Sequence, residues 1–419
     1  MLKRLWFIFG PILIAMLLLI SVLFLAPAKT SHNLSSEKRA ASALTKIVFK
    51  NATIKKGALS DPNHRFVPFF GSSEWKRFDE LHPSVLSEAY QRPYTPFLLG
   101  LQGAESLTHY FGMQQINTEL ENKQAVFFIS PQWFTKKGQG PISFNYYFAS
   151  DQGYRFLETA RNIPEDRYAA RRFLKVSPTS SLAKYMKKIA NGKSLSQFDL
   201  WQIKIQKSLA VHEDNLFSSL QFNNNFQKLV QPHAKRLPQP YNVQSLKQRA
   251  DELGNSQSNN NEFGIIDNFF STQIGAKLPK LKNSQRHFSY LQSPEYNDLQ
   301  LVLNEFARNN TDVMFVIPPV NAKWQSYTGL SEDMYQKTVT KIKYQLHSQG
   351  FKHIADFSKQ GNQEFFMEDT IHLGWNGWLA FDKHVNRFLT TKQVQPTYKL
   401  NDYFFSNQWA NKKDIPNKK

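Results

Sequence analysis

The chain has 419 residues and no cysteine. The absence of cysteine excludes disulfide bonds, thiol catalysis and any metal site with cysteine ligands, so the fold must be stabilised by packing alone. The chain also lacks a glycine-rich loop that could cradle phosphate and any recognisable nucleic-acid module. Nucleic acid is therefore not among the partners that we expect.

Acidic residues are scarce relative to basic ones. Lysine and arginine number 52 and aspartate and glutamate 33, which gives a formal net charge of +19. Such a surface attracts polyanions, and outside a cell the abundant ones are anionic lipid head groups and phosphate-rich wall polymers. The plainer alternative is that the charge only keeps the protein soluble.

Long hydrophobic runs are absent except at the start of the chain. There, Lys3 and Arg4 precede an uncharged apolar run from Leu5 to Ala28, which as a helix could cross about 30 Å of hydrocarbon. A cleaved signal peptide is the alternative, because 26–28 offer an Ala-x-Ala pattern, but its apolar part would normally be only about 7–15 residues. We predict a single-pass anchor in the lipid bilayer over 1–28, with a cytoplasmic N-terminus and the rest of the chain extracellular.

The rest of the chain divides by composition. A polar segment over 29–60 is expected to be a stem, 61–395 an α/β domain, and 396–419 a polar basic tail. Within the domain, 155–290 is polar and basic with helical periodicity, which indicates a helical insertion.

Apolar runs alternate with helical patterns on both sides of this insertion. Strands are predicted at 66–70, 125–130, 312–317 and 353–357, and helices at 83–91, 296–309, 331–349 and up to about 389. This alternation predicts a central parallel sheet covered by helices, a three-layer α/β/α fold. Ligands of such sheets bind beyond the carboxyl ends of the strands.

Two short segments indicate chemistry at those strand ends. Phe70–Glu74 (Phe-Gly-Ser-Ser-Glu) ends the first apolar run, and Asp369–His372 (Asp-Thr-Ile-His) lies near the C-terminus. A serine on a tight turn can act as a nucleophile if a histidine takes its proton and a carboxylate orients the imidazole ring. Each segment alone has an ordinary interpretation, the first as a turn and the second as a helix N-cap with a nearby histidine.

Taken together, these motifs resemble the DltD family of Gram-positive bacteria. The resemblance rests on the N-terminal apolar run, Phe-Gly-Ser-Ser-Glu, the Gly-x-x-Gly segment at 100–103, Ser-Pro-Gln-Trp-Phe at 130–134 and Asp-Thr-Ile-His, and it covers nearly the whole chain. It implies an SGNH-hydrolase-like domain outside the membrane that acts in the D-alanylation of (lipo)teichoic acid. It also implies partners: the polymer, a membrane-bound DltB-like acyltransferase and the D-alanyl carrier protein.

The resemblance carries over to single residues. Ser73 matches the nucleophile, with Ser72 as a rival, and Asp369 and His372 match the other triad members. The oxyanion hole is expected from the backbone of Ser73, from Gly103 (Gly100 being the competing choice) and from Gln132, where the wider pattern has an asparagine. Further candidates for substrate binding are Ser72, Glu74, Trp133 and Trp375, although tryptophans are often simply core residues.

The expected function is that of a membrane-anchored Ser-Asp-His O-acyltransferase. It would move a D-alanyl group through Ser73 to hydroxyls of the polymer, and this chemistry requires neither cofactor nor metal. An esterase or thioesterase with the same triad is one alternative, since exclusion of water and placement of an acceptor separate transfer from hydrolysis. A non-catalytic adaptor that binds teichoic acid or a carrier protein is the other.

Overall fold

A computed structural model describes residues 2–25, 32–218, 223–392 and 395–415. Five parallel strands form one sheet in the order β2-β1-β3-β4-β5. Their bounds are β1 Phe66–Gly71, β2 Thr95–Gly100, β3 Gln124–Phe128, β4 Asp312–Ile317 and β5 His353–Asp356. The predicted parallel sheet is confirmed, and the apolar run before Gly100 adds a strand to it.

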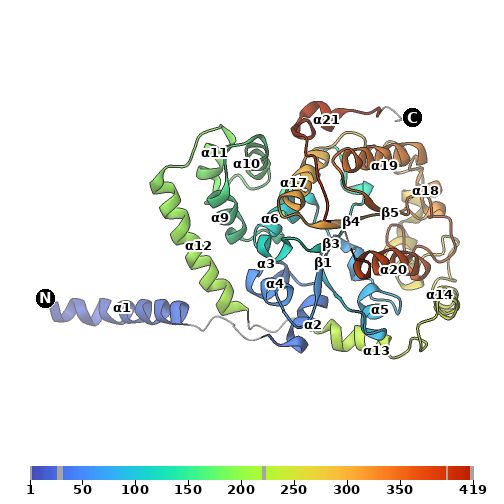
Figure 1. Ribbon diagram of the computed structural model, residues 1–419, viewed down its shortest axis with the longest axis horizontal. Helices are drawn as coiled ribbons and strands as arrows, with labels where there is room; N and C mark the ends of the chain where they lie inside the picture. Colours follow the sequence, from blue (N-terminus) through green and yellow to red (C-terminus); the bar gives the residue numbers. More distant parts are fainter. Residues whose placement is uncertain (1, 26–31, 219–222, 393–394, 416–419) are drawn as a thin grey trace.

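Alternating side chains of the strands build a hydrophobic core on each face of the sheet. Phe70, Phe127 and Phe315 belong to one core, whereas their neighbours Phe69 and Phe128 belong to the other. The first core is covered by α4 Ala52–Leu59, α6 Ser106–Met113, α17 Glu295–Arg308 and α19 Glu332–His347. The second is covered by α5 Pro83–Ala89, α14 Val243–Gln257 and α20 Trp375–Thr390 (Figure 1). The fold therefore has three layers.

The strand order places β1 at the topological switch of the sheet. From β1 the chain moves outward to β2, returns to β3 on the other side of β1 and then continues outward to β4 and β5. Crevices at such a switch, beyond the carboxyl ends of the strands, are the usual ligand sites of open parallel sheets. Pro68 is accommodated in β1 because the pairing with β3 begins only at Phe69.

The segment between β3 and β4, which includes the predicted insertion at 155–290, is helical. Its described residues contain no strand, and its α-helices are α8 Pro141–Tyr147, α9 Ser150–Thr159, α10 Pro164–Val176, α11 Ala183–Ala190, α12 Gln197–Phe217, α13 Gln231–Ala234, α14, α15 Asp267–Phe269, α16 Leu278–Leu281 and α17. The first part packs directly onto the sheet layer, because the rings of Phe144, Phe156 and Phe173 contact Phe111 of α6.

The segment 29–60 differs from the expected polar stem. It contains α2 Leu34–Ser42, α3 Lys46–Lys50 and α4, and it buries Ala40, Ala41 and Ala43. Lys55 is also buried, and its ammonium donates to the carbonyl oxygen of Phe49 and the side chain of Gln115. The composition of this segment looks polar in the sequence, yet its small alanines belong to the first core and Lys55 is buried.

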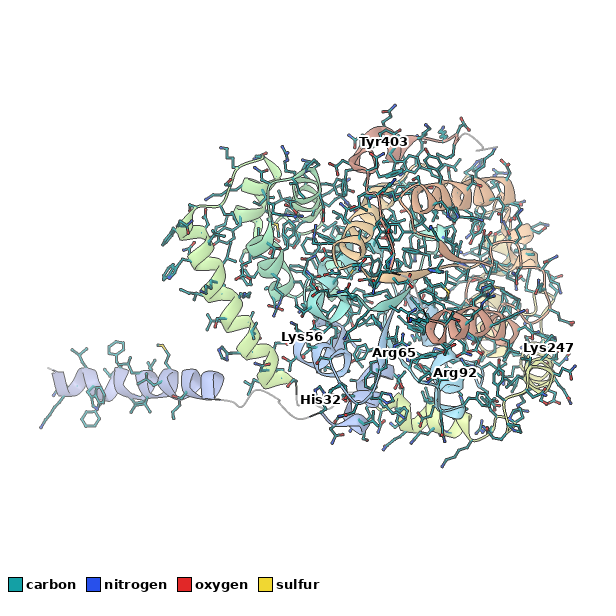
Figure 2. All side chains as sticks on the ribbon, viewed as in Figure 1. His32, Lys56, Arg65, Arg92, Lys247 and Tyr403 are labelled. Atoms are coloured by element: carbon teal, nitrogen blue, oxygen red, sulfur yellow. The ribbon has the colours of Figure 1, made fainter. Side chains whose placement is uncertain are left out.

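The basic tail also packs onto the domain. Its described part holds a short 3-10 helix, Asp402–Phe405, and α21 Asn407–Asn411. The Trp409 side chain is buried, and its indole N–H donates to Gln345 of α19 at 2.9 Å. Tyr403 marks this segment at the edge of the domain in Figure 2. Residues on both sides of the predicted domain, 61–395, therefore pack onto it.

The N-terminal apolar run forms a helix, α1 Leu2–Leu25. Among the described residues, none of the helices meets the length and apolarity needed to cross a bilayer. The last three residues of the predicted anchor, 26–28, lie outside the described residues. The anchor stays a prediction.

Candidate active site

The candidate nucleophile lies directly after the central strand. β1 ends at Gly71, and Ser73 begins a short 3-10 helix, Ser73–Lys76. A Cβ atom on Gly100 would lie 2.7 Å from the carbonyl carbon of Gly71, so β1 and β2 approach here as only glycine allows. The Trp75 side chain packs beneath the turn, where a Cβ atom on Gly71 would lie 2.7 Å from its indole nitrogen. The turn is thus fixed by close packing.

Ser73, His372 and Asp369 are joined by hydrogen bonds across 299 residues of sequence. The Ser73 hydroxyl lies 2.8 Å from Nε2 of His372. Nδ1 of the same ring lies 2.7 Å from Oδ2 of Asp369. Asp369 and His372 belong to the loop between β5 and α20, which meets the β1 turn at the carboxyl edge of the sheet. The arrangement matches the nucleophile, base and orienting carboxylate of acyl-transfer sites in its order of contacts.

Asp369 is fully buried but surrounded by groups that favour its ionised form. Its Oδ1 accepts hydrogen bonds from the backbone N–H groups of Ile371 and His372, at 2.9 and 3.0 Å. The Arg77 guanidinium donates to Oδ2 at 2.6 Å. Burial alone would raise the pKa of Asp369, but His372, Arg77 and the backbone donors hold it well below its ordinary value.

The carboxylate of Asp369 raises the pKa of the His372 imidazole. Burial lowers its pKa, whereas Asp369 raises it through charge and hydrogen bonding, and the net pKa is raised. The ring is therefore a stronger base than an ordinary histidine. Glu74 is the nearby acidic side chain that also raises the pKa of His372, although burial raises the pKa of Glu74 itself.

The two adjacent serines have different surroundings. The Ser72 hydroxyl donates to the carbonyl oxygen of Leu101 at 3.1 Å and accepts from the Gly103 N–H at 3.0 Å. The Ser72 N–H donates to the Glu74 carboxylate. Ser72 is therefore fully engaged in holding the β1 and β2 turns together, while the Ser73 hydroxyl points to the histidine.

The three expected oxyanion donors are in unequal positions. Gly103 has a left-handed backbone, with φ of +82°, and its N–H is occupied by Ser72. The Ser73 N–H stands at the first position of a helix, where N–H groups have no acceptor inside the helix. Gln132 lies in the short helix Pro131–Trp133 after β3, half-buried, and its side chain makes no hydrogen bond to the described residues.

The tryptophans proposed as substrate contacts are core residues. Trp375 has no exposed surface and packs against Phe365, with ring centroids 6.2 Å apart. In the described structure this side chain therefore offers no surface to a substrate, and its role in substrate binding stays a prediction. Trp378 stacks on Trp75 in the same core. Trp133 is buried in the other core beside His109, at 6.4 Å between ring centroids.

The sequence motifs missed several groups around the triad. Arg77, four residues after Ser73, contacts Asp369 and lies over the Phe269 ring at 4.9 Å. Nε2 of the buried His109 lies 2.7 Å from the Gly71 carbonyl oxygen, and burial lowers its pKa to about 4, so the neutral ring supports the end of β1. An arginine beside the nucleophile turn was the one available signal, because a buried orienting carboxylate needs a cation.

Two buried carboxyl groups lie beside the triad. Burial raises the pKa of Asp79 to about 8 and raises that of Glu368 well above its ordinary value. Asp79 and Asp369 also raise the pKa of Glu368, which is adjacent in sequence to Asp369. Near neutral pH these two groups tend to hold protons, which leaves Asp369 as the ionised carboxylate next to His372.

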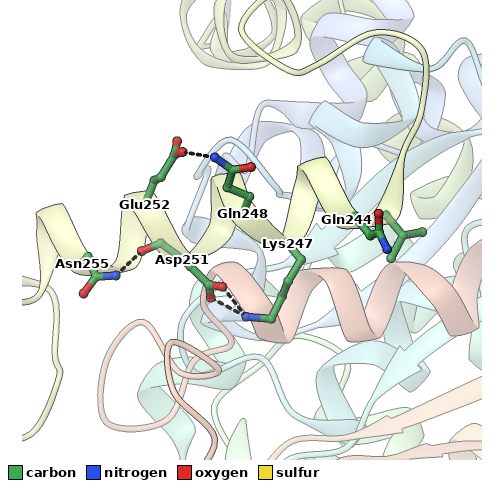
Figure 3. Close-up of a pocket in the computed structure, with 7 residues that line it drawn as sticks. Gln244, Lys247, Gln248, Asp251, Glu252 and Asn255 are labelled. Carbon is green, nitrogen blue, oxygen red and sulfur yellow. Dashed lines mark hydrogen bonds and ion pairs between the residues drawn. The ribbon is translucent and has the colours of Figure 1, made fainter.

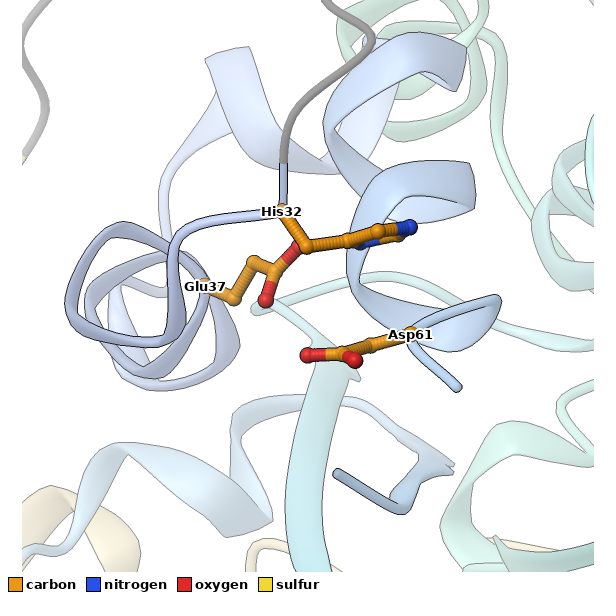
Figure 4. Close-up of side chains that lie close together, drawn as sticks. All are labelled: His32, Glu37 and Asp61. Carbon is orange, nitrogen blue, oxygen red and sulfur yellow. The ribbon is translucent and has the colours of Figure 1, made fainter. Parts of the chain in front are cut away.

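Two other features lie away from the triad. His32, Glu37 and Asp61 bring possible ligand atoms within 4.8 Å of one another (Figure 4), but Nδ1 of His32 already lies 2.9 Å from Glu37. A surface hollow along α14 (Figure 3) is lined by residues of that one helix, among them the ion pair Lys247–Asp251. Neither feature contains a residue of the triad.

The fold and the site define an α/β protein with a Ser–His–Asp hydrogen-bond chain at the carboxyl edge of a parallel sheet. The chain belongs to the DltD family: the family model described as DltD protein matches residues 41–390. It is 44% identical to Protein DltD of Lacticaseibacillus rhamnosus over 414 residues, which cover 97% of this chain and 96% of that protein.

Two more distant relatives carry the same name. Protein DltD of Bacillus subtilis is 31% identical over 401 residues, covering 92% of this chain and 98% of its own length. Protein DltD of Staphylococcus aureus is 26% identical over 389 residues, covering 91% and 95%. The resemblance drawn from the motifs is confirmed.

Proposed function

We propose that this protein is a serine acyltransferase in the D-alanylation of lipoteichoic acid. The observation that carries the proposal is the 2.8 Å contact between the Ser73 hydroxyl and Nε2 of His372, whose other nitrogen is bound to the buried Asp369. Membership of the DltD family supports the pathway. The net charge of +19 suits a phosphate-rich polymer as acceptor.

In the first half-reaction, Nε2 of His372 takes the Ser73 proton while Oγ attacks the acyl carbon of a D-alanyl donor. A tetrahedral intermediate forms, and its collapse breaks the bond to the leaving group, which receives the proton from His372. Asp369 stabilises the imidazolium while it exists. The product is a D-alanyl ester on Ser73.

In the second half-reaction, a hydroxyl of the polymer attacks the ester. Nε2 of His372 takes its proton, the bond between the acyl carbon and Ser73 Oγ breaks, and Oγ recovers the proton from His372. The oxyanion of each intermediate would be met by the Ser73 N–H and by Gln132. Gly103 would then act indirectly, because its N–H holds the Ser72 hydroxyl.

The pH dependence follows from the raised pKa of His372. The neutral ring is the base, so activity falls as the pH drops through its pKa in the free enzyme. We expect this acidic limb above the ordinary histidine pKa of about 6.5. Asp369, with its lowered pKa, stays ionised throughout that range.

The adjacent serines provide the test. The full chain and its Ser73→Ala and Ser72→Ala variants are incubated with a D-alanyl thioester or a serine-directed phosphonate, and their intact masses are measured. We expect the wild type and Ser72→Ala to gain the adduct and Ser73→Ala to gain none. Labelling of Ser73→Ala at the wild-type rate would overturn the assignment, and a chain that needs neither serine for D-alanylation would act as an adaptor.

Hydrolysis of D-alanyl or related esters is the second candidate. Trp133, Trp375 and Trp378, the bulky side chains that could keep water from the site, are all buried in the two cores. With the same triad, an open site would pass the acyl group to water. The ratio of alanylated polymer to free alanine, measured at increasing polymer concentration, separates the two activities.

We further propose that 1–28 anchor the chain in the membrane with the domain outside, near the membrane-bound D-alanine transfer machinery. The support is the apolar run after Lys3 and Arg4. Protease treatment of intact cells tests the placement, since the domain should be cleaved without lysis. Protection until lysis would contradict it.

A further inference from the structure

Helix α12 exposes apolar side chains to solvent. Four large ones have exposed fractions from 38% to 63%: Phe198, Trp201, Ile205 and Leu209. The rings of Phe198 and Trp201 stack, with centroids 5.7 Å apart. At about 100° of rotation per residue, the four side chains fall within an arc of roughly 80° on one face of the helix. They form a continuous stripe, which we call the α12 stripe.

The stripe is not the face that packs on the domain. The opposite face of α12 buries Asp199 and Ile203 and contacts α9. The Asp199 carboxylate caps the start of the helix and pairs with Lys188 of α11, at 2.5 Å. Lys207 pairs with Glu158 of α9 at 2.5 Å. The helix is therefore held by one side, and Phe198, Trp201, Ile205 and Leu209 remain exposed on the other.

The charge beside the stripe is positive. From 200 to 212 the sequence contains no acidic residue, and Lys204 lies next to the stripe, whereas Lys207 is on the packed face and is paired with Glu158. Lys204 is exposed, and it and Lys187 and Lys193 nearby make no ion pair with a described residue. An apolar stripe with an aromatic end and flanking lysines has the composition of helices that lie in the interface of an anionic membrane.

The position of α12 agrees with such a surface. In Figure 1, α12 lies on the side of the domain from which α1 extends, and it runs obliquely to α1. The two helices are in contact. If α1 passes through a bilayer, its contact with α12 places α12 close to that bilayer.

We propose that α12 is a second membrane contact, which lays Phe198, Trp201, Ile205 and Leu209 into the outer surface of an anionic lipid bilayer. The inference rests on the proposed placement of the domain outside the membrane. Helices of this kind bury their apolar face about 5–10 Å into the boundary between head groups and acyl chains. With α1 it would make two points of attachment, so the domain would keep a fixed orientation and hold its site at one distance from the membrane.

The absence of cysteine makes a clean test possible. Ile205→Cys places one label in the stripe, and Lys337→Cys places the control label on the exposed surface of α19. The full-length chain, labelled with an environment-sensitive fluorophore, is reconstituted into vesicles of phosphatidylglycerol and phosphatidylcholine or of phosphatidylcholine alone. Quenching by nitroxide lipids and by aqueous iodide is then measured.

We expect lipid quenching of the label at 205 at least about twofold above that at 337, iodide quenching correspondingly lower, and both differences reduced without the anionic lipid. Equal quenching at both positions in a chain that floats with the vesicles would overturn the second contact and leave the anchor standing. A chain that does not float would overturn both. Shielding from iodide that depends on protein density, without lipid quenching, would assign the stripe to a second copy of the chain.

Discussion

Asp369 and Glu295 are both fully buried acids, yet their surroundings drive their protonation in opposite directions. Burial disfavours the charge in each case. Asp369 receives the Arg77 guanidinium, the His372 ring and two backbone N–H groups, and its pKa falls. Glu295 receives one backbone N–H, that of Ser106, and its second oxygen has no partner in the described structure.

The neighbours of Glu295 strengthen this contrast. Its pKa is raised well above the ordinary value by burial and by the nearby acids Glu105 and Asp298. Burial raises the pKa of Glu105 to about 8 as well. The charge of Asp298 is matched by Arg172, at 2.5 Å, and by the Tyr168 hydroxyl at 2.6 Å. Hydrogen-bond donors, and not depth of burial, therefore distinguish the carboxylate of Asp369 from Glu295 and Glu105, which we call the packing acids.

The largest expected effect is on activity, from Asp369→Asn. The amide cannot hold His372 in the tautomer that accepts the Ser73 proton, so we expect D-alanyl transfer to fall by roughly 10³–10⁴-fold. Circular dichroism should show an intact fold, and the exposed Asp333→Asn serves as the control. A near-normal rate would mean that Asp369 acts only as a cap for the backbone of 371 and 372.

The next effect is on stability, from Asp298→Asn. This change leaves the buried Arg172 without its counter-charge, and breaking a buried pair costs about 3–5 kcal/mol. Urea unfolding followed by fluorescence measures the loss. The double variant with Arg172→Met should recover part of it, and a double variant no more stable than Asp298→Asn would show that the pair matters mainly through its packing.

A smaller effect is expected from Arg77→Gln. Arg77 lowers the pKa of both Asp369 and His372, so without it the pKa of His372 rises and the acidic limb of kcat/KM moves to higher pH. We expect about a tenfold loss near neutral pH, the equivalent of one unit of pKa. Arg77→Lys should restore part of the loss. An unchanged acidic limb in Arg77→Gln would remove Arg77 from the positioning of the triad.

The sequence predicted the sheet well because its strands are continuous apolar runs. β4 was predicted over its full length, and Ser73 follows the end of β1, at the edge where a parallel sheet brings distant segments such as the Asp369–His372 loop together. The sequence did not predict how single side chains pack. Trp375 has the composition of a site wall, but only the three-dimensional fold shows that α20 turns this side chain inward.

The sequence did not predict hydrogen-bond partners either. Ser72 and Ser73 are chemically identical neighbours, and only the positions of Leu101, Gly103 and His372 distinguish them. Segment 29–60 was misjudged because alanines that fill tight space count little toward hydrophobic periodicity. Composition indicates which segments are apolar, whereas the fit between layers decides which small and charged residues join the core.

The smallest expected effect tests the packing acids, through Glu105→Gln. Its folded-state pKa of about 8 lies above the ordinary glutamate value of about 4.3, so the folded chain binds the proton more tightly than the unfolded chain. The unfolded state therefore releases protons first, and stability contributed by this group is lost as the pH rises from about 4 to about 8. Glutamine resembles the protonated acid and does not titrate, so the variant does not lose this stability as the pH rises. We expect equal melting temperatures at pH 5 and a variant that melts about 1 °C higher at pH 8, which corresponds to about 1 kcal/mol at an unfolding entropy of about 2.1 cal/mol/K per residue. Asp369→Asn, measured in the same way, should show the opposite trend, because its lowered pKa adds stability above pH 4 that the amide cannot supply. Parallel behaviour of the two variants would mean that buried acids in this protein respond to burial alone, and that the donors around Asp369 do not set its charge.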